Sequence, residues 1–270
     1  MIIVIQCMTK GQFFTTFGFL MITEPFFYLC AIPAILIFGM AKGGFGGGIS
    51  ILSVPLLALA VPPVQAAAIL LPILVVMDFF ALNSFRGQCS VENLKIIIPG
   101  AAMGILVGTF TFSYLSADMI RIIMGAIAVI FTLDYWFKRK IIQGSKPDRL
   151  KGTIWSAIAG FTSFGVHAGG PPISIYLLPQ KMDKAILMGT FAWFFSVVNL
   201  LKLIPYTWLG LFDYTNIVTS LVLVPLAPVG VGLGYFLLNK VSVNTIYNLC
   251  YVFLFFAGIS LLYKGFIGLS

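Results

Sequence analysis

Charged residues are scarce in this chain, and their scarcity excludes a soluble globular protein. Only 9% of the 270 residues are Asp, Glu, Lys or Arg, whereas soluble domains carry about 25%. Hydrophobic residues make up 60%, and the mean hydropathy is +1.06. So few charges cannot cover a water-facing surface. Because helices satisfy their own backbone hydrogen bonds in lipid, the composition predicts an all-α polytopic protein of the cell (inner) membrane.

Motifs typical of enzymes and metal sites are also lacking. The chain has one histidine and four cysteines, none in a C-x-x-C spacing, so neither a metal nor a redox site is expected. The motifs G-x-x-x-x-G-K-[S/T] and G-x-S-x-G are absent, which removes the usual phosphate-binding loop and the hydrolase nucleophile elbow. We therefore expect no cofactor and no enzymatic activity. An intramembrane enzyme stays open as an alternative, and it needs a second polar group beside His167 or Asp78.

The net charge of +8 does not indicate nucleic-acid binding, because the cations gather between the two halves of the chain. This cluster places the loop in the cytoplasm by the positive-inside rule. It consists of Lys138, Arg139, Lys140, Lys146, Arg149 and Lys151.

Apolar segments alternate with short polar links along the whole chain. The second segment of each half is shorter than the roughly 20 residues that a full span requires, so it is predicted to be a partial or re-entrant helix. The ten segments are 27–41, 47–60, 65–85, 95–115 and 119–137, then 153–166, 171–180, 185–206, 215–238 and 243–263.

The two halves are related by sequence. A shift of 124 residues aligns the glycine-rich run 43–48 with 167–172, and a shift of 126 aligns the Gly-x-x-x-Gly pair 104/108 with 230/234. The uncharged link 61–63 is expected outside, whereas the corresponding link of the second half carries Lys181 and Lys184 and is expected inside. The sequence therefore predicts two inverted repeats of about five apolar segments each. A parallel pair of four-span repeats is the alternative.

The resulting domain boundaries follow the charge pattern. Residues 1–22 are expected to be an N-terminal extension or an extra anchor helix, because they have no counterpart in the second half. The first repeat takes 23–138, the basic cytoplasmic linker 139–151 and the second repeat 152–270.

Each glycine-rich run interrupts an apolar stretch. Lipid cannot satisfy a freed backbone N–H or C=O, and paired interruptions in two halves indicate the substrate site of a transporter. The predicted substrate-binding residues are Lys42, Gly43, Gly44, Gly46, Gly47, Ser50, Asp78, His167, Gly169, Gly170 and Ser174.

Three of these side chains can carry charge or protons. Lys42 attracts an anion to the N–H groups at the break, unless it extends to an interface. Asp78 is too short to reach an interface and is expected inside the bundle, paired with a cation or carrying a proton. His167 binds an oxyanion, titrates near neutral pH or is structural. Lys202, near a segment end, is expected to extend to the interface.

Ser50 and Ser174 follow the two breaks at equivalent positions. Their hydroxyls either donate to an anion or bond back to the carbonyl four residues earlier. Asn199 is a weaker candidate for the site.

The repeated elements resemble the sulfite exporter TauE/SafE family, also described as the toluenesulfonate uptake permeases. The resemblance rests on the run Lys42–Pro55, on Ser53-Val54-Pro55-Leu56-Leu57 with the link to Ala68, and on the looser second copy Tyr176-Leu177-Leu178-Pro179. It covers about residues 25–266. The second break departs from the all-glycine form through His167, Pro171 and Pro172.

The resemblance implies a secondary transporter of small sulfur-containing anions, sulfite or organosulfonate. An exporter working by alternating access is expected, since a negative charge leaves an inside-negative cell downhill by about 2.3 kcal/mol per 100 mV. Expected partners are a small anionic substrate and the lipid bilayer, with no nucleic acid and with a homodimer left open. A carrier of a different organic anion and a structural subunit are the remaining alternatives.

Overall fold

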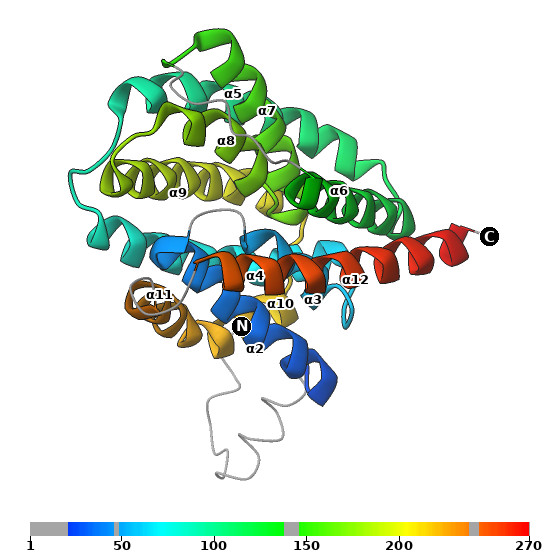
Figure 1. Ribbon diagram of the computed structural model, residues 1–270. Helices are drawn as coiled ribbons and strands as arrows, with labels where there is room; N and C mark the ends of the chain where they lie inside the picture. The colour runs from blue at the N-terminus through cyan, green and yellow to red at the C-terminus, as the bar shows by residue number, and fades with distance from the viewer. Residues whose placement is uncertain (1–20, 46–48, 138–145, 238–242, 270) are drawn as a thin grey trace, which may run out of the picture.

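The computed structural model describes residues 21–45, 49–137, 146–237 and 243–269, and all its regular elements there are helices (Figure 1). In chain order they are α2 (Pro25–Met40), η1 (Ala41–Phe45), η2 (Ser50–Leu52), α3 (Ser53–Leu57), α4 (Pro63–Ser84), α5 (Val91–Ser113), α6 (Ala117–Phe137), α7 (Arg149–Val166), α8 (Gly170–Leu177), η3 (Leu178–Gln180), α9 (Lys184–Trp208), α10 (Tyr214–Leu223), α11 (Leu226–Leu237) and α12 (Val243–Leu269).

The helices have the length and hydropathy of a multi-pass membrane protein. Six described helices can cross a bilayer, or seven spans result if the bent pair α10 and α11 counts as one. The prediction of an all-α membrane fold is confirmed. The expected apolar segment 215–238 is bent near its centre, where α10 and α11 meet at 43°. Pro225 lies in the gap, where its missing N–H interrupts the helix.

The partial helices expected after the breaks are present. α3 has five residues and α8 has eight, far short of a span. The expectation for residues 1–22 falls almost entirely outside the described residues.

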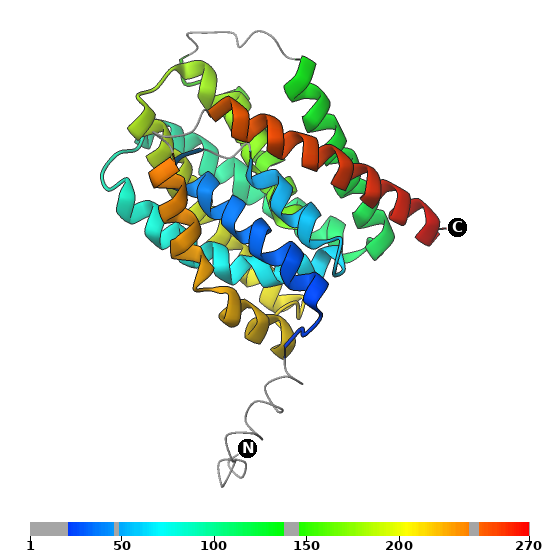
Figure 2. The same cartoon turned by 60° about the horizontal axis from the view of Figure 1, so that its bottom comes forward.

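Helices of the two halves pack in a reciprocal pattern. α4 packs on α9 and α6 on α12, while α5 packs on α7 and α11 on α2. The views in Figures 1 and 2 show α4 crossing the centre of the bundle, with α12 extending from one side. A two-fold axis between two equivalent halves would produce this pairing. The inverted repeat itself stays a prediction.

Glycines bring the paired helices close together. A Cβ on Gly230 of α11 would lie 3.0 Å from Gly39 Cα in α2, and one on Gly104 of α5 would lie 2.8 Å from the Phe161 backbone nitrogen in α7. Small residues at such crossings are the usual way in which membrane helices approach. The two Gly-x-x-x-Gly pairs thus serve the same purpose in both halves, as the sequence indicated.

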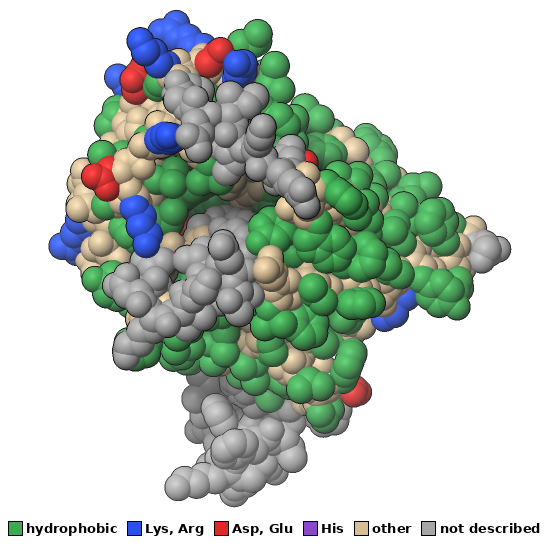
Figure 3. Space-filling view, in the orientation of Figure 1, with side chains coloured by type: hydrophobic (Ala, Val, Ile, Leu, Met, Phe, Trp, Pro, Cys, Tyr) green, Lys and Arg blue, Asp and Glu red, His purple; other side chains and the backbone are tan. Residues whose placement is uncertain are grey.

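Most exposed cations lie at one end of the bundle. Hydrogen bonds at this end join Asn93 Nδ2 to Gln180 Oε1 (2.9 Å) and the Ser90 N–H to Thr190 Oγ1 (2.9 Å), so α5 and α9 begin side by side. Figure 3 shows Lys and Arg gathered at the upper left of an otherwise apolar face. The positive-inside rule assigns this end to the cytoplasm. Its described cations are Arg86, Lys95, Lys146, Arg149, Lys151, Lys181 and Lys184.

The close crossing of α2 and α11 gives a direct test. Gly230→Val should lower the melting temperature of the detergent-solubilised protein, because overpacking a close helix contact costs about 1–3 kcal/mol. Gly232→Val is the matched control, since a Cβ at Gly232 meets nothing within 4 Å. Equal melting temperatures for the two variants would contradict the α2–α11 contact.

Candidate functional site

The first break follows α2 without a gap. α2 continues into η1, a short π-helical turn. Gly44 in this turn has φ = 148°, a conformation that strains residues with side chains. Gly43 is buried against α11, and a Cβ there would lie 3.0 Å from Gly234 Cα. The structure therefore gives Gly43 and Gly44 a backbone and packing role. Gly46 and Gly47 lie outside the described residues.

Lys42 and Asp78 form an ion pair inside the bundle. Lys42 Nζ contacts Asp78 Oδ1, and the two side chains are only 7% and 5% exposed. The second carboxylate oxygen accepts a hydrogen bond of 2.6 Å from Asn199 Nδ2 of α9. The Lys42 ammonium also lies 3.5 Å from the Leu74 carbonyl oxygen. Three elements, η1, α4 and α9, are thus joined by one buried carboxylate.

The second break begins where His167 ends α7. His167 has φ = 50° and ψ = 26°, a left-handed conformation that closes helices. The His167 N–H donates to the Ser163 carbonyl (3.1 Å) and the Ala168 N–H to that of Thr162 (3.2 Å). The Thr162 hydroxyl donates to the Ala168 carbonyl at 3.1 Å. These bonds satisfy the end of α7 within the apolar interior.

Lys202 lies beside His167 and is completely buried, so its expected extension to the interface is wrong. Its Nζ is 2.6 Å from His167 Nδ1 and 3.1 Å from both the carbonyl and the hydroxyl oxygen of Ser163. His167 Nε2 lies 3.0 Å from the Ala67 carbonyl oxygen in α4. The side chain points from α9 into the bundle, where these polar groups replace water around the ammonium.

The two pairs occupy similar positions, with Lys42 displaced by one residue from the position that corresponds to His167. Asp78 and Lys202 are 124 residues apart, as are Gly43 and His167. In each half, a residue of the break contacts a charged residue on the next long helix. The charge on that helix is negative in the first half and positive in the second.

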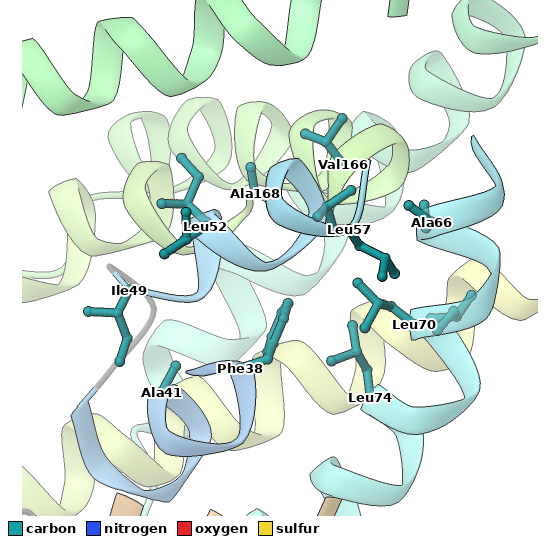
Figure 4. Close-up of a cluster of buried hydrophobic side chains, with 14 of the residues drawn as sticks. Phe38, Ala41, Ile49, Leu52, Leu57, Ala66, Leu70, Leu74, Val166 and Ala168 are labelled. Carbon is teal, nitrogen blue, oxygen red and sulfur yellow. The ribbon is translucent and has the colours of Figure 1, made fainter. Parts of the chain in front are cut away.

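Phe38 joins the two pairs. Its ring centre is 5.7 Å from Lys42 Nζ and 6.5 Å from the centre of the His167 ring. Figure 4 shows Phe38 projecting into the apolar cluster formed around both breaks, near Ala41 and Leu74. Lys42, Asp78 and His167 are therefore brought into one region, as the sequence predicted for paired breaks.

The remaining candidates divide into two groups. Ser50 is buried and lines a cavity with Lys42 and Asp78. Ser174 bonds back to the Gly170 carbonyl at 2.8 Å, the local alternative considered for it. Gly169 packs near Ser163, and Gly170 begins α8.

The sequence does not single out Ser163, and it places Lys202 at the interface and Asn199 among the weaker candidates, whereas in the structure Ser163 and Lys202 lie beside His167 and Asn199 contacts Asp78. The signal that could have found Lys202 is its distance of 124 residues from Asp78. In the described part of the chain, no three His, Cys, Asp or Glu side chains gather to hold a metal ion.

Two cavities flank the polar pairs. The smaller has a volume of about 20 Å³ and is lined by Lys42, Ser50, Asp78 and apolar residues of α9. A water needs about 10–15 Å³ by the same measure, so this cavity holds one or two. The larger, about 230 Å³, is lined by residues that include Ala67, Phe164 and Tyr206. The two lie toward opposite ends of α4 and α9.

The buried ion pair gives a stability test. Lys42→Met should lower the melting temperature strongly, because removing one partner of a buried pair costs about 3–5 kcal/mol. Lys42→Met combined with Asp78→Leu should recover most of this loss, since no unpaired charge remains.

The comparison pair is Asp118 and Arg121, an ion pair on α6 whose side chains are about a quarter exposed. Removing Arg121 should cost at most about 1 kcal/mol. If the single and double variants at Lys42 and Asp78 unfold at the same temperature, the two charges are not coupled.

One comparison with known proteins identifies a family for this chain. The family model described as sulfite exporter TauE/SafE matches residues 31–261. No curated protein and no solved structure matches the chain. The match begins within α2 and ends within α12, so it includes both breaks and both buried lysines. The chain belongs to the sulfite exporter TauE/SafE family of membrane transporters.

Proposed function

We propose that this protein is a secondary carrier that exports small sulfur-containing anions, sulfite or organosulfonate, by alternating access around its two broken helices. The family supports a membrane transporter of sulfite or sulfonate. The observation that carries the proposal for this chain is a pair of buried lysines, Lys42 and Lys202, at the two breaks.

Buried cations at helix breaks favour a negatively charged ligand. A charge inside the membrane is costly unless it is paired, and intramembrane ionisable residues usually mark a transport pathway. Lys42 and Lys202 come from different halves, and the Asp78 carboxylate contacts Lys42. An anion that enters between them gains Coulomb energy that water would screen.

The cavities support access from alternate sides. Ala81 and Met188 line the small cavity toward the cationic end, whereas Val64 and Leu209 line the large cavity toward the other end. The layer of Lys42, Asp78, His167 and Lys202 lies between these regions. In the proposed cycle this conformation is closed at the cytoplasmic side and wider at the outer side.

Export agrees with the membrane potential, because an anion leaving the inside-negative cell moves downhill in electrical free energy.

Neither rival class explains the buried charges as well. An enzyme needs a free base, yet both ring nitrogens of His167 are engaged, by Lys202 and by the Ala67 carbonyl. A structural subunit gives no reason for two lysines buried at paired breaks.

Flux in proteoliposomes tests the proposal. We expect sulfite to leave vesicles when an inside-negative potential is imposed without a pH gradient. Lys42→Met should reduce this flux at least about tenfold, since a tenfold loss corresponds to only 1.4 kcal/mol. Lys42→Arg should retain part of it, because the positive charge remains.

Lys264→Met is the matched control, because Lys264 is an exposed lysine that contacts the Leu59 carbonyl. Absence of flux in the wild type for sulfite and for a simple sulfonate would remove the carrier assignment. Flux driven by a pH gradient alone would overturn the uncoupled export that we propose.

Cysteine accessibility tests the alternating cavities. In a cysteine-free background, Ala67→Cys should react with a membrane-impermeant maleimide added outside, and Ala81→Cys with reagent added inside. Added sulfite should change the two rates in opposite directions, since one cavity widens as the other closes. Parallel changes in both rates would contradict alternating access.

A further inference from the structure

We propose that two pairs of carboxamide side chains, one at each end of the bundle, are the gates of this carrier. The inner pair is Asn93 with Gln180, at the cationic end, and the outer pair is Gln65 with Asn216, at the opposite end. The inference rests on the proposed function and deepens it by naming the contacts that break when each side of the bundle opens.

The inner pair is closed by two hydrogen bonds. Asn93 Nδ2 donates to Gln180 Oε1 at 2.9 Å, and Gln180 Nε2 donates to Asn93 Oδ1 at 3.1 Å. Asn93 is buried in the first turn of α5, while Gln180 is the last residue of η3, directly after the partial helix α8. The pair therefore ties the end of the second broken helix to α5. The bond from the Ser90 N–H to Thr190 Oγ1 adds α9 to this contact.

The outer pair is closed by one hydrogen bond. Gln65 Nε2, in the first turn of α4, donates to Asn216 Oδ1 at 3.0 Å. Asn216 is buried in the first turn of α10, and its own Nδ2 donates to the Leu211 carbonyl and to Asp213 Oδ2, both at 3.0 Å. These two bonds hold the Asn216 amide in the orientation that accepts from Gln65. The outer pair ties α4 of the first half to α10 of the second.

The two asparagines occupy equivalent positions in the two halves. Each is the third residue of the helix that follows a central helix, since α5 follows α4 and α10 follows α9. The Asn93 N–H donates to the hydroxyl of the N-cap Ser90, and the Asn216 N–H donates to the carboxylate of the N-cap Asp213. Such caps fix the first turn of a helix, so each asparagine is held where its amide meets a neighbouring helix.

The equivalent pairs lie at opposite ends of the bundle. α4 begins at Pro63, beside Gln65, and ends at Ser84, two residues before Arg86 of the cationic end. Its 22 residues span about 33 Å, which is comparable to the thickness of the hydrocarbon core of a bilayer. One pair is therefore close to each membrane surface, which is where an alternating-access carrier needs its gates.

The outer pair borders the large cavity. Val64, next to Gln65 in α4, and Leu211, whose carbonyl accepts from Asn216, both line this cavity. When α4 and α10 separate at the outer pair, these lining residues move apart. The cavity then opens to the outer surface.

The inner pair lies on the side of the small cavity. Met188 and Phe191, which flank Thr190 in α9, line this cavity, and Thr190 accepts from the N-cap Ser90 of α5. Two amide hydrogen bonds thus close the side with a cavity of about 20 Å³, and one closes the side with a cavity of about 230 Å³. The side that is held by more bonds is the side with less space.

Carboxamides suit a gate that opens and closes in every cycle. When a pair at the membrane surface separates, water replaces the lost hydrogen bonds, so the net contribution of each bond to the closed state is small. The buried ion pair of Lys42 and Asp78 lacks this exchange, because separating two charges in the interior is costly. The amides also carry no charge, so a passing anion is neither repelled nor retained at either gate.

The reaction rates of cysteines in the two cavities test the proposal. The reporters are Ala81→Cys with the maleimide added inside and Ala67→Cys with the maleimide added outside, each in the cysteine-free background. Asn93→Leu removes the inner hydrogen bonds with a side chain of similar shape. It should raise the Ala81→Cys rate about fivefold, as the loss of an amide hydrogen bond implies, without raising the Ala67→Cys rate. Asn216→Leu should raise the Ala67→Cys rate and not the Ala81→Cys rate.

Asn248→Leu is the matched control. The Asn248 side chain accepts a hydrogen bond of 2.9 Å from the Tyr135 hydroxyl, between α6 and α12 on an exposed edge of the bundle. Both reporters should react at the wild-type rate in this variant. A gate variant that raises both rates has loosened the whole bundle, and one that raises neither does not act on a gate. Either result would overturn the proposal.

Cross-linking tests the same pairs in proteins that transport before the link is made. Asn93→Cys with Gln180→Cys, and Gln65→Cys with Asn216→Cys, are each joined by a bis-methanethiosulfonate reagent in the cysteine-free background. Each link should lower sulfite flux in proteoliposomes to the level of protein-free vesicles, because one side of the bundle can no longer open. Reduction of the link should restore the flux, which a misfolded protein would not show.

Asp118→Cys with Arg121→Cys is the control for the reagent, since a link within one turn of α6 restrains no other helix. A wild-type protein that moves neither sulfite nor a sulfonate removes the carrier assignment and the gates with it. A wild-type protein that moves sulfite, together with linked pairs whose flux is unchanged, keeps the carrier and overturns the gates.

Discussion

The structure depends on one constraint: lipid satisfies neither a freed backbone group nor an unpaired charge. Each helix break in this chain frees backbone groups and lies beside a buried ionisable side chain. Residues from other helices of the bundle supply the hydrogen bonds and ion-pair partners that these groups need. Lys42 of the first break is held by Asp78 of α4, and Asp78 in turn by Asn199 of α9. His167 of the second break contacts Lys202 of α9 and the Ala67 carbonyl of α4. The central pair α4 and α9 thus supports both breaks.

Close packing of the outer helices makes these contacts possible. A backbone can approach a break only where side chains are small, and Gly39 meets Gly230 where α2 crosses α11. The same arrangement recurs where Gly104 of α5 meets α7. Glycine therefore has two separate uses here. At Gly44 it permits an unusual backbone angle, and at the crossings it permits short distances between helix axes.

Sequence reasoning located the breaks, the spans and the interior position of Asp78, because each has a local cause. Interrupted apolar runs and a short carboxylate side chain far from any interface can be recognised without knowing the fold. The residue that pairs with each buried ionisable side chain could not be predicted from the local sequence. The position of Lys202 before Pro205, near a segment end, predicts extension to the interface, because a lysine stem is long enough to extend outward. Its burial follows from the direction in which α9 faces α7. That direction is a tertiary fact that hydropathy does not contain.

The two halves repeat in helix order but differ in charge, and this difference bears on the transport cycle. Identical inverted halves would make inward-open and outward-open states equal in energy, apart from the membrane potential. Here Lys42 of the first break is paired with the carboxylate of Asp78, whereas the hydrogen-bond partners of Lys202, beside the second break, are all uncharged groups. The cavity beside the Lys42–Asp78 pair is small, about 20 Å³, while the larger cavity, about 230 Å³, is lined by residues that include Ala67 and Tyr206. In the proposed carrier, the exchange of Asp78 for Lys202 at equivalent positions removes the symmetry that would make the two access states equal in energy.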